Sequence, residues 1–240
     1  VKRTKRIINK DVPLYDDSCL KEYVNLPYIG WVREGIMPDT CKRFNIGYSY
    51  DKRRIIIPWR KWDGDENEYL GIVGRTTVPK YELLDIPKYF GIIPFSKGIN
   101  IYGLNENYKY IQEAGYIVVF EAEKSTLKRA SRLDNTGSSL GNCEITDEQV
   151  RILISLDVEI VIALDEGIDI NHIRKECEKF YPLRKVSYIY DRWDLIPKGS
   201  KNSPADMPNK IYNFLFKHRT VYDEKERKLY KDWLEKQNKN

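Results

Sequence analysis

The sequence is poor in the residue types that build metal clusters and covalent cross-links. Its 240 residues include only four cysteines and two histidines. The cysteines Cys19, Cys41, Cys143 and Cys177 lie far apart and never form a CxxC pair, so their spacing encodes no zinc-binding module. We therefore expect reduced thiols and a cytoplasmic protein.

Signatures of several other functional classes are also missing. No apolar run approaches the ~20 residues of a membrane-spanning helix, and no secretory signal pattern opens the sequence, so we expect a soluble protein without membrane partners. The glycines of GIVGRT do not have the GxxxxGK[ST] spacing of a phosphate loop, which argues against an ATP-driven motor. His172 and His218 lie in charged helical segments, where we expect them to be solvated, and no Ser-His-Asp or Cys-His arrangement is evident.

The composition favours a folded protein with a mildly basic surface. Hydrophobic residues make up 41% of the chain, which is enough to bury a core. The 41 basic and 36 acidic residues leave a net charge of +5, which permits a polyanionic partner without requiring one. The first ten residues, VKRTKRIINK, contain five cations and no acid, and form either a basic arm or a solvated tail.

Three regions of the chain differ in residue composition and in the pattern of their hydrophobic residues. Residues 1–112 are rich in Tyr, Trp, Pro and Gly, and the segments RRIIIPW and EYLGIVGRT, joined by DGDEN, predict a strand pair in an α+β subdomain. Residues 113–206 alternate apolar runs with helical patterns, which predicts an α/β domain with a central parallel sheet. Residues 207–240 are charged and helical, and form a C-terminal helical segment.

The second region divides into alternating strands and helices. The capping-box spacing of Thr146 and Gln149 starts one helix, and Asn171 is the expected cap of another. In chain order we expect the strand YIVVF, the helix KSTLKRASRL, the helix TDEQVRILISL, the strand VEIVIALD, the helix NHIRKECEKF and the strand KVSYIYD.

Each of the three expected strands ends in an acid: Glu121, Asp165 and Asp191. An acid at a strand end is usually a cap or turn residue. The carboxyl ends of parallel strands, however, share one edge of the sheet, where ligands bind in open α/β folds. Neighbouring strands lie ~4.8 Å apart, so carboxylates at their ends can converge on one cation. Magnesium suits such oxygen ligands, and the pattern therefore predicts a magnesium site.

The residues at these strand ends carry a family resemblance. The runs EAEKS, SSLGNCEITDEQVRIL and IALDEG resemble the TOPRIM core of bacterial and phage DnaG-type primases. Upstream, VREGIMPDTCKRFNIGY, IIIPW, GIVGR, IPKYF and FSKGINIYGLN follow in the order of that family. Together these motifs cover roughly residues 31 to 195 and imply an RNA-polymerase domain with a TOPRIM fold and without the zinc-binding module of the family.

The resemblance implies synthesis of short RNA primers on single-stranded DNA from nucleoside triphosphates. Glu121 and Asp165 would be catalytic and would bind Mg²⁺ or Mn²⁺, two ions in total, together with Asp191, Asp194 and Asp169. Phosphates and template would be held by Arg75, Lys88, Tyr89 and Lys97. A replicative helicase is a further expected partner, and a phage or plasmid origin would fit the missing zinc module.

The sequence departs from the family pattern at four positions. Ala122 replaces the glycine of the first acidic turn, and Ser125 stands where many relatives have an acid. Gly167 occupies the second position of the DxD pair, where Glu166 or Asp169 would have to substitute, and Asn202 replaces an expected acid in KNSPAD. Two alternatives therefore remain open: a TOPRIM metal-dependent nuclease, and a degenerate, non-catalytic module that binds single-stranded DNA.

The first region also interleaves cations with aromatic residues, a combination that suits single-stranded nucleic acid. Most of these aromatics are expected to belong to the core, however, including those of IIIPW. The stacking of bases on this region is therefore the weaker expectation.

Overall fold

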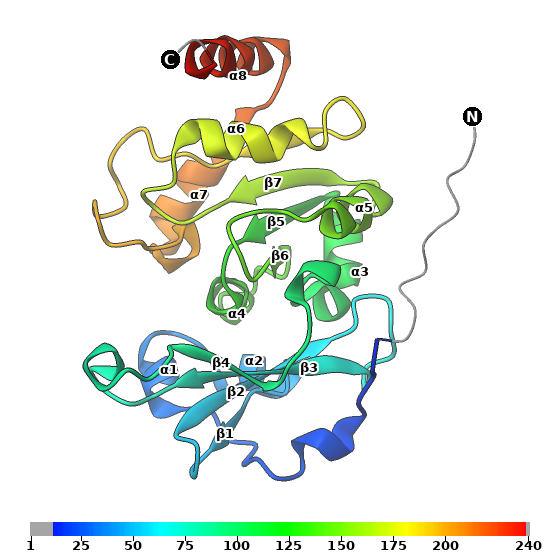
Figure 1. Cartoon of the computed structure of the whole chain (residues 1–240), viewed down its shortest axis with the longest axis vertical. Coiled ribbons are helices and arrows are strands. Elements are labelled where there is room, and N and C mark those ends of the chain that lie inside the picture. Colours follow the sequence, from blue (N-terminus) through cyan, green and yellow to red (C-terminus); the bar gives the residue numbers. More distant parts are fainter. Residues whose placement is uncertain (1–11, 239–240) are drawn as a thin grey trace.

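Two β-sheets, with helix α4 (Glu123–Ser131) between them, form the framework of the chain (Figure 1). The computed structural model describes residues 12–238, so the basic arm predicted at residues 1–10 lies outside the described part. No helix between residues 12 and 238 has both the length and the apolar character that crossing a lipid bilayer requires. All four cysteines carry free thiols, as expected.

The first sheet is an antiparallel meander of four strands. In chain order and in space these are β1 (Gly47–Ser49), β2 (Arg54–Arg60), β3 (Tyr69–Thr76) and β4 (Tyr89–Ile93). Strands β2 and β3 are the predicted pair, which is therefore confirmed. The short helices α1 (Ile29–Arg33) and α2 (Pro38–Arg43), and the 3₁₀ helices η1 (Asp17–Leu20), η2 (Tyr81–Leu84) and η3 (Lys97–Ile99), surround this sheet.

The second sheet has five strands in the order β6-β5-β7-β8-β9. Strands β6 (Gly137–Ser139), β5 (Tyr116–Phe120), β7 (Glu159–Ala163) and β8 (Val186–Tyr188) are parallel, and β9 (Thr220–Val221) runs antiparallel at the edge. The helices of this half are α3 (Leu104–Ala114), α5 (Asp147–Ser155), α6 (Ile170–Glu178), α7 (Asn209–Lys217) and α8 (Glu224–Gln237), with the 3₁₀ helix η4 (Pro204–Asp206). The predicted fold class, with a central parallel sheet after an α+β subdomain, is confirmed.

The central strands of this sheet are buried on both faces. In β5, Ile117 and Val119 pack in one cluster with apolar side chains of α3, α5 and α6. Their neighbours Val118 and Phe120 point to the opposite face, into a second cluster with α7 and η4. Burial on both faces explains why the strand reads as an uninterrupted apolar run rather than an alternating one.

Helix α4 ties the two sheets together, and Figure 1 shows it between them. Leu127 and Ala130 pack in a cluster with Trp59 and Ile57 of β2. At its N-terminal end, α4 follows directly on β5 through Glu121 and Ala122. The acidic end of β5 therefore faces the first sheet.

Packing crosses both of the domain boundaries that the sequence predicts, at residues 112 and 206. Leu104 and Ile111 of α3 belong to the core cluster of the second sheet, upstream of the first boundary. Strand β9 pairs with β8, and Leu215 of α7 packs beside Val118, downstream of the second. The helical C-terminal segment is thus part of the second half of the fold.

The helix caps confirm one expectation and correct another. Helix α5 begins with the predicted capping box between Thr146 and Gln149. Helix α6 is capped by Asp169, whose side chain accepts a bond from the backbone N–H of Asn171, so the prediction that Asn171 is the cap was wrong. Both residues have cap-forming side chains two positions apart, and the sequence alone does not separate them.

Gln149 is a buried polar link between the segment after η3 and the segment after β6. Its Nε2 donates to the backbone oxygens of Asn100, at 2.9 Å, and of Leu140, at 3.0 Å. We expect Gln149→Leu to leave these carbonyls unpaired and to destabilise the fold by about 2 kcal/mol, or roughly 4–8 °C in Tm. Thermal unfolding measures this, with Arg151→Leu on the exposed side of the same helix as the matched control, and equal losses in both variants would contradict the assignment.

Candidate functional site

Glu121 and Asp165 lie at the carboxyl ends of two neighbouring parallel strands. In the register of β5 and β7, Phe120 lies opposite Ala163, so Glu121 follows β5 by one residue and Asp165 follows β7 by two. Both side chains are half-buried. The prediction that the acidic strand ends share one edge of the sheet is therefore confirmed for this pair.

Asp165 is the most perturbed of the predicted acids. Burial, followed by the charges of Glu121 and Asp206, raises the pKa of its carboxyl group to about 7, and Lys88 opposes the rise. Its Oδ1 is shielded from solvent and has no hydrogen-bond partner among the described residues. A buried carboxylate oxygen without a partner is costly unless a cation or donor binds it, so this atom fits a metal ligand.

Glu121 lies in a more mixed electrostatic environment. Burial raises the pKa of its carboxyl group, and the charges of His172 and Lys88 lower it. His172 on α6 is half-buried rather than solvated, with its Nε2 3.1 Å from the carbonyl oxygen of Cys143. Sequence reasoning did not predict that the charge of this histidine acts on Glu121, because the two residues lie far apart in the chain.

A third acid, Asp206 in η4, joins the pair, and the sequence interpretation missed it. The neighbouring Ala205 packs in one cluster with Phe120 and Ala163, which brings η4 to the ends of β5 and β7. Asp206 Oδ2 accepts a bond of 2.8 Å from the backbone N–H of Ser203, in a capping box. The three-residue spacing of Ser203 and Asp206 in SPAD was the available signal. We call Glu121, Asp165 and Asp206 the acidic edge.

The other predicted metal ligands have partners elsewhere. The two carboxylate oxygens of Asp191 accept bonds from the backbone N–H groups of Trp193 and Ile196 in its own loop. Asp169 is exposed and caps α6. Asp194 is also exposed and pairs with Lys198 at 3.0 Å.

The loop after β7, where the sequence departs from the family pattern, has a backbone conformation that favours glycine at position 167. Gly167 has φ +90°, and a Cβ there would meet open space. An L-residue at this position would be strained by the backbone rather than by crowding. The carboxylate of Glu166 accepts the backbone N–H of Lys201 at 3.3 Å, so it turns toward the loop before η4. Within residues 12–238, no three His, Cys, Asp or Glu side chains gather closely enough to hold one metal ion by themselves.

The four predicted nucleotide-binding residues gather around Tyr89, the first residue of β4. Its ring centroid lies 5.8 Å from Arg75 Cζ, 5.9 Å from Lys88 Nζ and 5.6 Å from Lys97 Nζ. Burial raises the pKa of the Tyr89 hydroxyl, and the charges of Glu123 and Asp165 add to the rise. Arg75, Lys88, Tyr89 and Lys97, the basic cluster, therefore lie beside the acidic edge although they belong to the other sheet.

The members of the basic cluster differ in solvent exposure and in how many of their charges are already paired with other side chains. Lys97 Nζ pairs with the buried Glu123 at 2.7 Å, and Trp59 Nε1 donates to the same carboxylate at 3.2 Å. Arg75 lies over the ring of Trp31, with 5.6 Å between Cζ and the ring centroid. Lys88 is exposed, and its charge acts on both Glu121 and Asp165. Trp31 and Trp59 are buried, which agrees with the expectation that most aromatic residues of the first region belong to the core.

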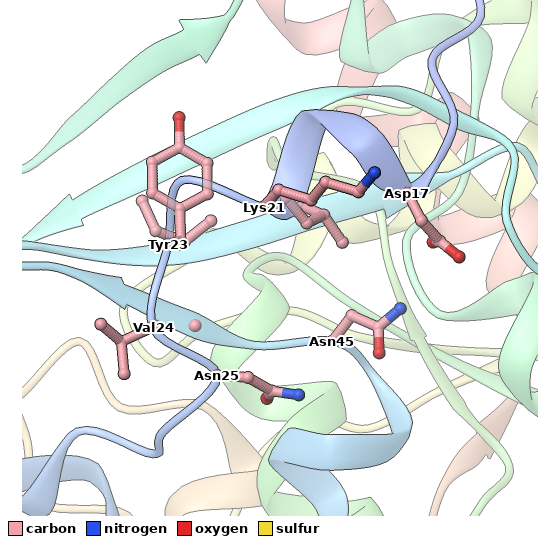
Figure 2. Close-up of a pocket in the computed structure, with 9 residues that line it drawn as sticks. Asp17, Lys21, Tyr23, Val24, Asn25 and Asn45 are labelled. Carbon is pink, nitrogen blue, oxygen red and sulfur yellow. The ribbon is translucent and has the colours of Figure 1, made fainter.

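The hollow shown in Figure 2 lies elsewhere in the first half of the chain. It encloses about 340 Å³. Its walls come from the segment around η1 and from β1 and β2: Asp17, Leu20, Lys21, Tyr23, Val24, Asn25, Asn45, Gly47 and Ile56. None of the acidic edge or of the basic cluster lines it.

Known proteins resemble the chain most clearly in structure. A DnaG primase catalytic domain bound to single-stranded DNA superposes with a TM-score of 0.67 at 14% identity, over 85% of this chain and 77% of that one. The Aquifex aeolicus primase, comprising zinc-binding and RNA-polymerase domains, gives 0.61 at 21% identity over 90% and 59%. The E. coli primase catalytic core gives 0.63 at 15% identity over 85% and 79%.

The chain has the fold of the DnaG primase catalytic domain. No family model matches its sequence. A prophage-derived uncharacterized protein of Bacillus subtilis, YorJ, is 27% identical in an alignment that covers 85% of this chain. The chain spans 60% of the length of that relative.

The raised pKa of Asp165 predicts how the primase-like fold responds to pH without metal. Between the ordinary value of 3.8 and about 7, the folded protein holds a proton that the unfolded chain releases, so stability falls as pH rises through this window. Asp165→Asn removes this dependence. We expect the variant to match the wild type at pH 4 and to exceed it by about 2 kcal/mol at pH 8, a value reduced from the full shift because the side chain is partly solvated.

Urea denaturation in EDTA at the two pH values measures this difference. Asp63→Asn is the control, because Asp63 is exposed and its partner, at 2.9 Å, is the surface residue Lys61. A stability difference between Asp165→Asn and the wild type that does not change with pH would contradict the shift.

Proposed function

We propose that the chain is a DNA primase catalytic domain, which synthesises short RNA primers on single-stranded DNA by metal-dependent nucleotidyl transfer. The observation that carries the proposal is the unpartnered Oδ1 of Asp165, placed beside Glu121 and within the influence of Lys88. A primase fold, and a structural relative whose domain is bound to single-stranded DNA, support the same conclusion.

The reaction forms one bond and breaks another at phosphorus. The 3′-hydroxyl of the growing primer attacks the α-phosphorus of a ribonucleoside triphosphate, and its proton passes to solvent water as the new O–P bond forms. The bond between the α-phosphorus and its bridging oxygen breaks, and pyrophosphate leaves. A divalent cation held by Glu121 and Asp165, Mg²⁺ or Mn²⁺, would lower the pKa of the hydroxyl and neutralise developing charge.

The residues of the chain supply charge and position for this step. Lys88 is exposed beside both acids, so its ammonium group suits a triphosphate oxygen. The guanidinium of Arg75 is held between the rings of Trp31 and Tyr89, which fixes it for a phosphate of nucleotide or template. Lys97 pairs with Glu123 and also lies over the rings of Trp59 and Tyr89, so its role is to keep these rings in place.

A second candidate is a non-catalytic module that binds single-stranded DNA. Gly167 and Asn202 favour it, because both replace acids expected from the primase pattern. Asp169, Asp191 and Asp194 also favour it, because their carboxylates are already bonded to backbone N–H groups or to Lys198. A primer-synthesis assay with ribonucleotides, metal and single-stranded template separates the candidates, and degradation of the template would indicate the nuclease alternative.

The biological setting follows from the same proposal. The prophage origin of the Bacillus relative supports a phage-type primase that acts in the bacterial cytoplasm. A replicative helicase is a candidate partner of such an enzyme.

We expect Glu121→Gln to abolish primer synthesis while the protein stays folded, because the proposed role of the carboxylate is to bind the metal rather than to support the fold. The readout is extension of labelled ribonucleotides on single-stranded DNA, with circular dichroism to confirm folding. Glu113→Gln on α3, an exposed acid paired with Lys109 at 3.9 Å, is the matched control and keeps full activity. A folded, fully active Glu121→Gln variant would overturn the proposed role.

Template binding is expected to depend on salt through the basic cluster. Affinity for single-stranded DNA falls steeply between about 50 and 200 mM salt if several phosphates are neutralised, and Lys88→Ala reduces the logarithmic slope by about 0.7. Fluorescence anisotropy with labelled oligothymidine measures both, and Lys109→Ala, with an exposed lysine on α3, is the control. An unchanged slope in Lys88→Ala would remove this residue from the interface.

A further inference from the structure

We propose that an exposed group of aromatic rings on α7 and in the loop after β8 is a second contact for the single-stranded DNA template. We call it the aromatic patch, and it comprises the rings of Trp193, Phe214 and His218 with the neighbouring cations Arg192, Lys210 and Lys217. None of these residues belongs to the acidic edge or to the basic cluster. The inference deepens the proposed function and rests on it, because it adds a contact for the strand that a primase copies.

The three rings pack against one another and still remain open to solvent. The ring centroid of Trp193 lies 5.0 Å from that of Phe214 and 5.4 Å from that of His218, with interplanar angles of 75° and 71°. The rings of Phe214 and His218 are 4.2 Å apart. Trp193 is nevertheless 43% exposed and Phe214 is 38% exposed. An indole that is held by two other rings, yet open to solvent, is pre-organised to stack on a base.

Helix α7 places a cation on each side of Phe214. Lys210 precedes Phe214 by four residues and Lys217 follows it by three, so the three side chains share one face of the helix, and all are exposed. The opposite face carries Tyr212 and Leu215, which pack in the core. A helix face that alternates cations with an aromatic ring suits a strand that presents phosphates and unpaired bases in turn.

The charge of this region favours a polyanion. Residues 207–222, which include all of α7, contain no acid. The two acids that flank Trp193 are already engaged. Asp191 accepts the backbone N–H groups of Trp193 and Ile196, and Asp194 pairs with Lys198 at 3.0 Å. The cations of the aromatic patch are therefore available to phosphates.

A protein partner is the other class of occupant that an exposed aromatic group could take. Lysine is depleted in protein–protein interfaces, whereas Phe214 lies between two lysines on its helix face. Nucleic acid fits this pattern better. The template fits better than the primer, because the bases of a primer are paired with the template and are not free to stack on a ring.

The aromatic patch lies close to the acidic edge along the chain. Helix α7 begins at Asn209, three residues after Asp206, and Phe214 lies about 7.5 Å further along the helix axis. Trp193 follows β8, a parallel neighbour of β7, at the same edge of the sheet. A template strand that passes the acidic edge can therefore continue onto the patch.

The test measures the affinity of a labelled oligothymidine by fluorescence anisotropy. We expect Trp193→Ala to raise the Kd about tenfold, as loss of one base–ring stack does in single-strand binding proteins, and Trp193→Phe, which keeps a ring, to raise it about twofold. Tyr108→Ala is the matched control and leaves the Kd unchanged. Tyr108 is 45% exposed on α3, which packs on the opposite face of the second sheet. Circular dichroism checks that each variant folds.

Two further readouts separate stacking from a structural role. DNA quenches the tryptophan fluorescence of the wild type, and Trp193→Phe loses part of this quenching, because a stacked base quenches the indole that it covers. Lys217→Ala reduces the logarithmic salt slope of binding by about 0.7, whereas Trp193→Ala, which removes no charge, leaves the slope unchanged.

Failure of the inference is distinguishable from failure of the proposed function. Primer synthesis by the wild type, with unchanged DNA affinity and quenching in the Trp193 variants, would overturn the inference alone and leave a protein as the occupant. A loss of affinity for oligouridine but not for oligothymidine would also overturn it, since the patch would then hold RNA. A tenfold loss in a protein that makes no primers would overturn the proposed function and retain the patch as a DNA contact.

Discussion

The close approach of two carboxylates at the ends of adjacent parallel strands is the constraint on which the rest of the structure depends. Glu121 and Asp165 are brought together by the register of β5 and β7, and neither strand can shift without moving an apolar side chain off its core face. Each carboxyl group is half-buried, so charge on one opposes charge on the other. The apolar core thus maintains an electrostatic conflict that a bound cation would relieve.

The compensating positive charge comes from a different part of the chain, and this makes the two sheets interdependent. Lys88 and Tyr89 lie at the start of β4, and their approach to Asp165 depends on how the first sheet packs against α4. Helix α4 contacts the neighbouring segments through buried polar residues as well as apolar ones. Glu123 holds Lys97 at its first turn, and Lys128 holds Asp206 one turn later. Both ion pairs join α4 to segments that the sequence places far away.

Local patterns predicted much of this structure. The apolar runs, the capping box of Thr146 and Gln149 and the hairpin of β2 and β3 are determined by residues close in sequence, and all three were confirmed. The pairing of Glu121 with Asp165 followed from the parallel topology alone. Asp206 and His172 were missed because their approach depends on loop paths between elements, for which no periodicity exists.

The acids after β7 and β8 show why a strand-end acid is weak evidence for a metal site. An aspartate carboxylate readily accepts a hydrogen bond from the backbone N–H two residues later in the chain. Asp169 before α6 and Asp191 in the loop after β8 both do so. The side chain of Asp165 accepts no such bond. Its loop turns at Gly167, which has a positive φ, and in that turn the N–H of Ile168 donates to the backbone carbonyl of Asp165 rather than to its carboxylate. The glycine that removes one expected ligand therefore also leaves its neighbour free. An acid is available to a ligand when the backbone around it offers no donor, and that property belongs to the turn rather than to the residue.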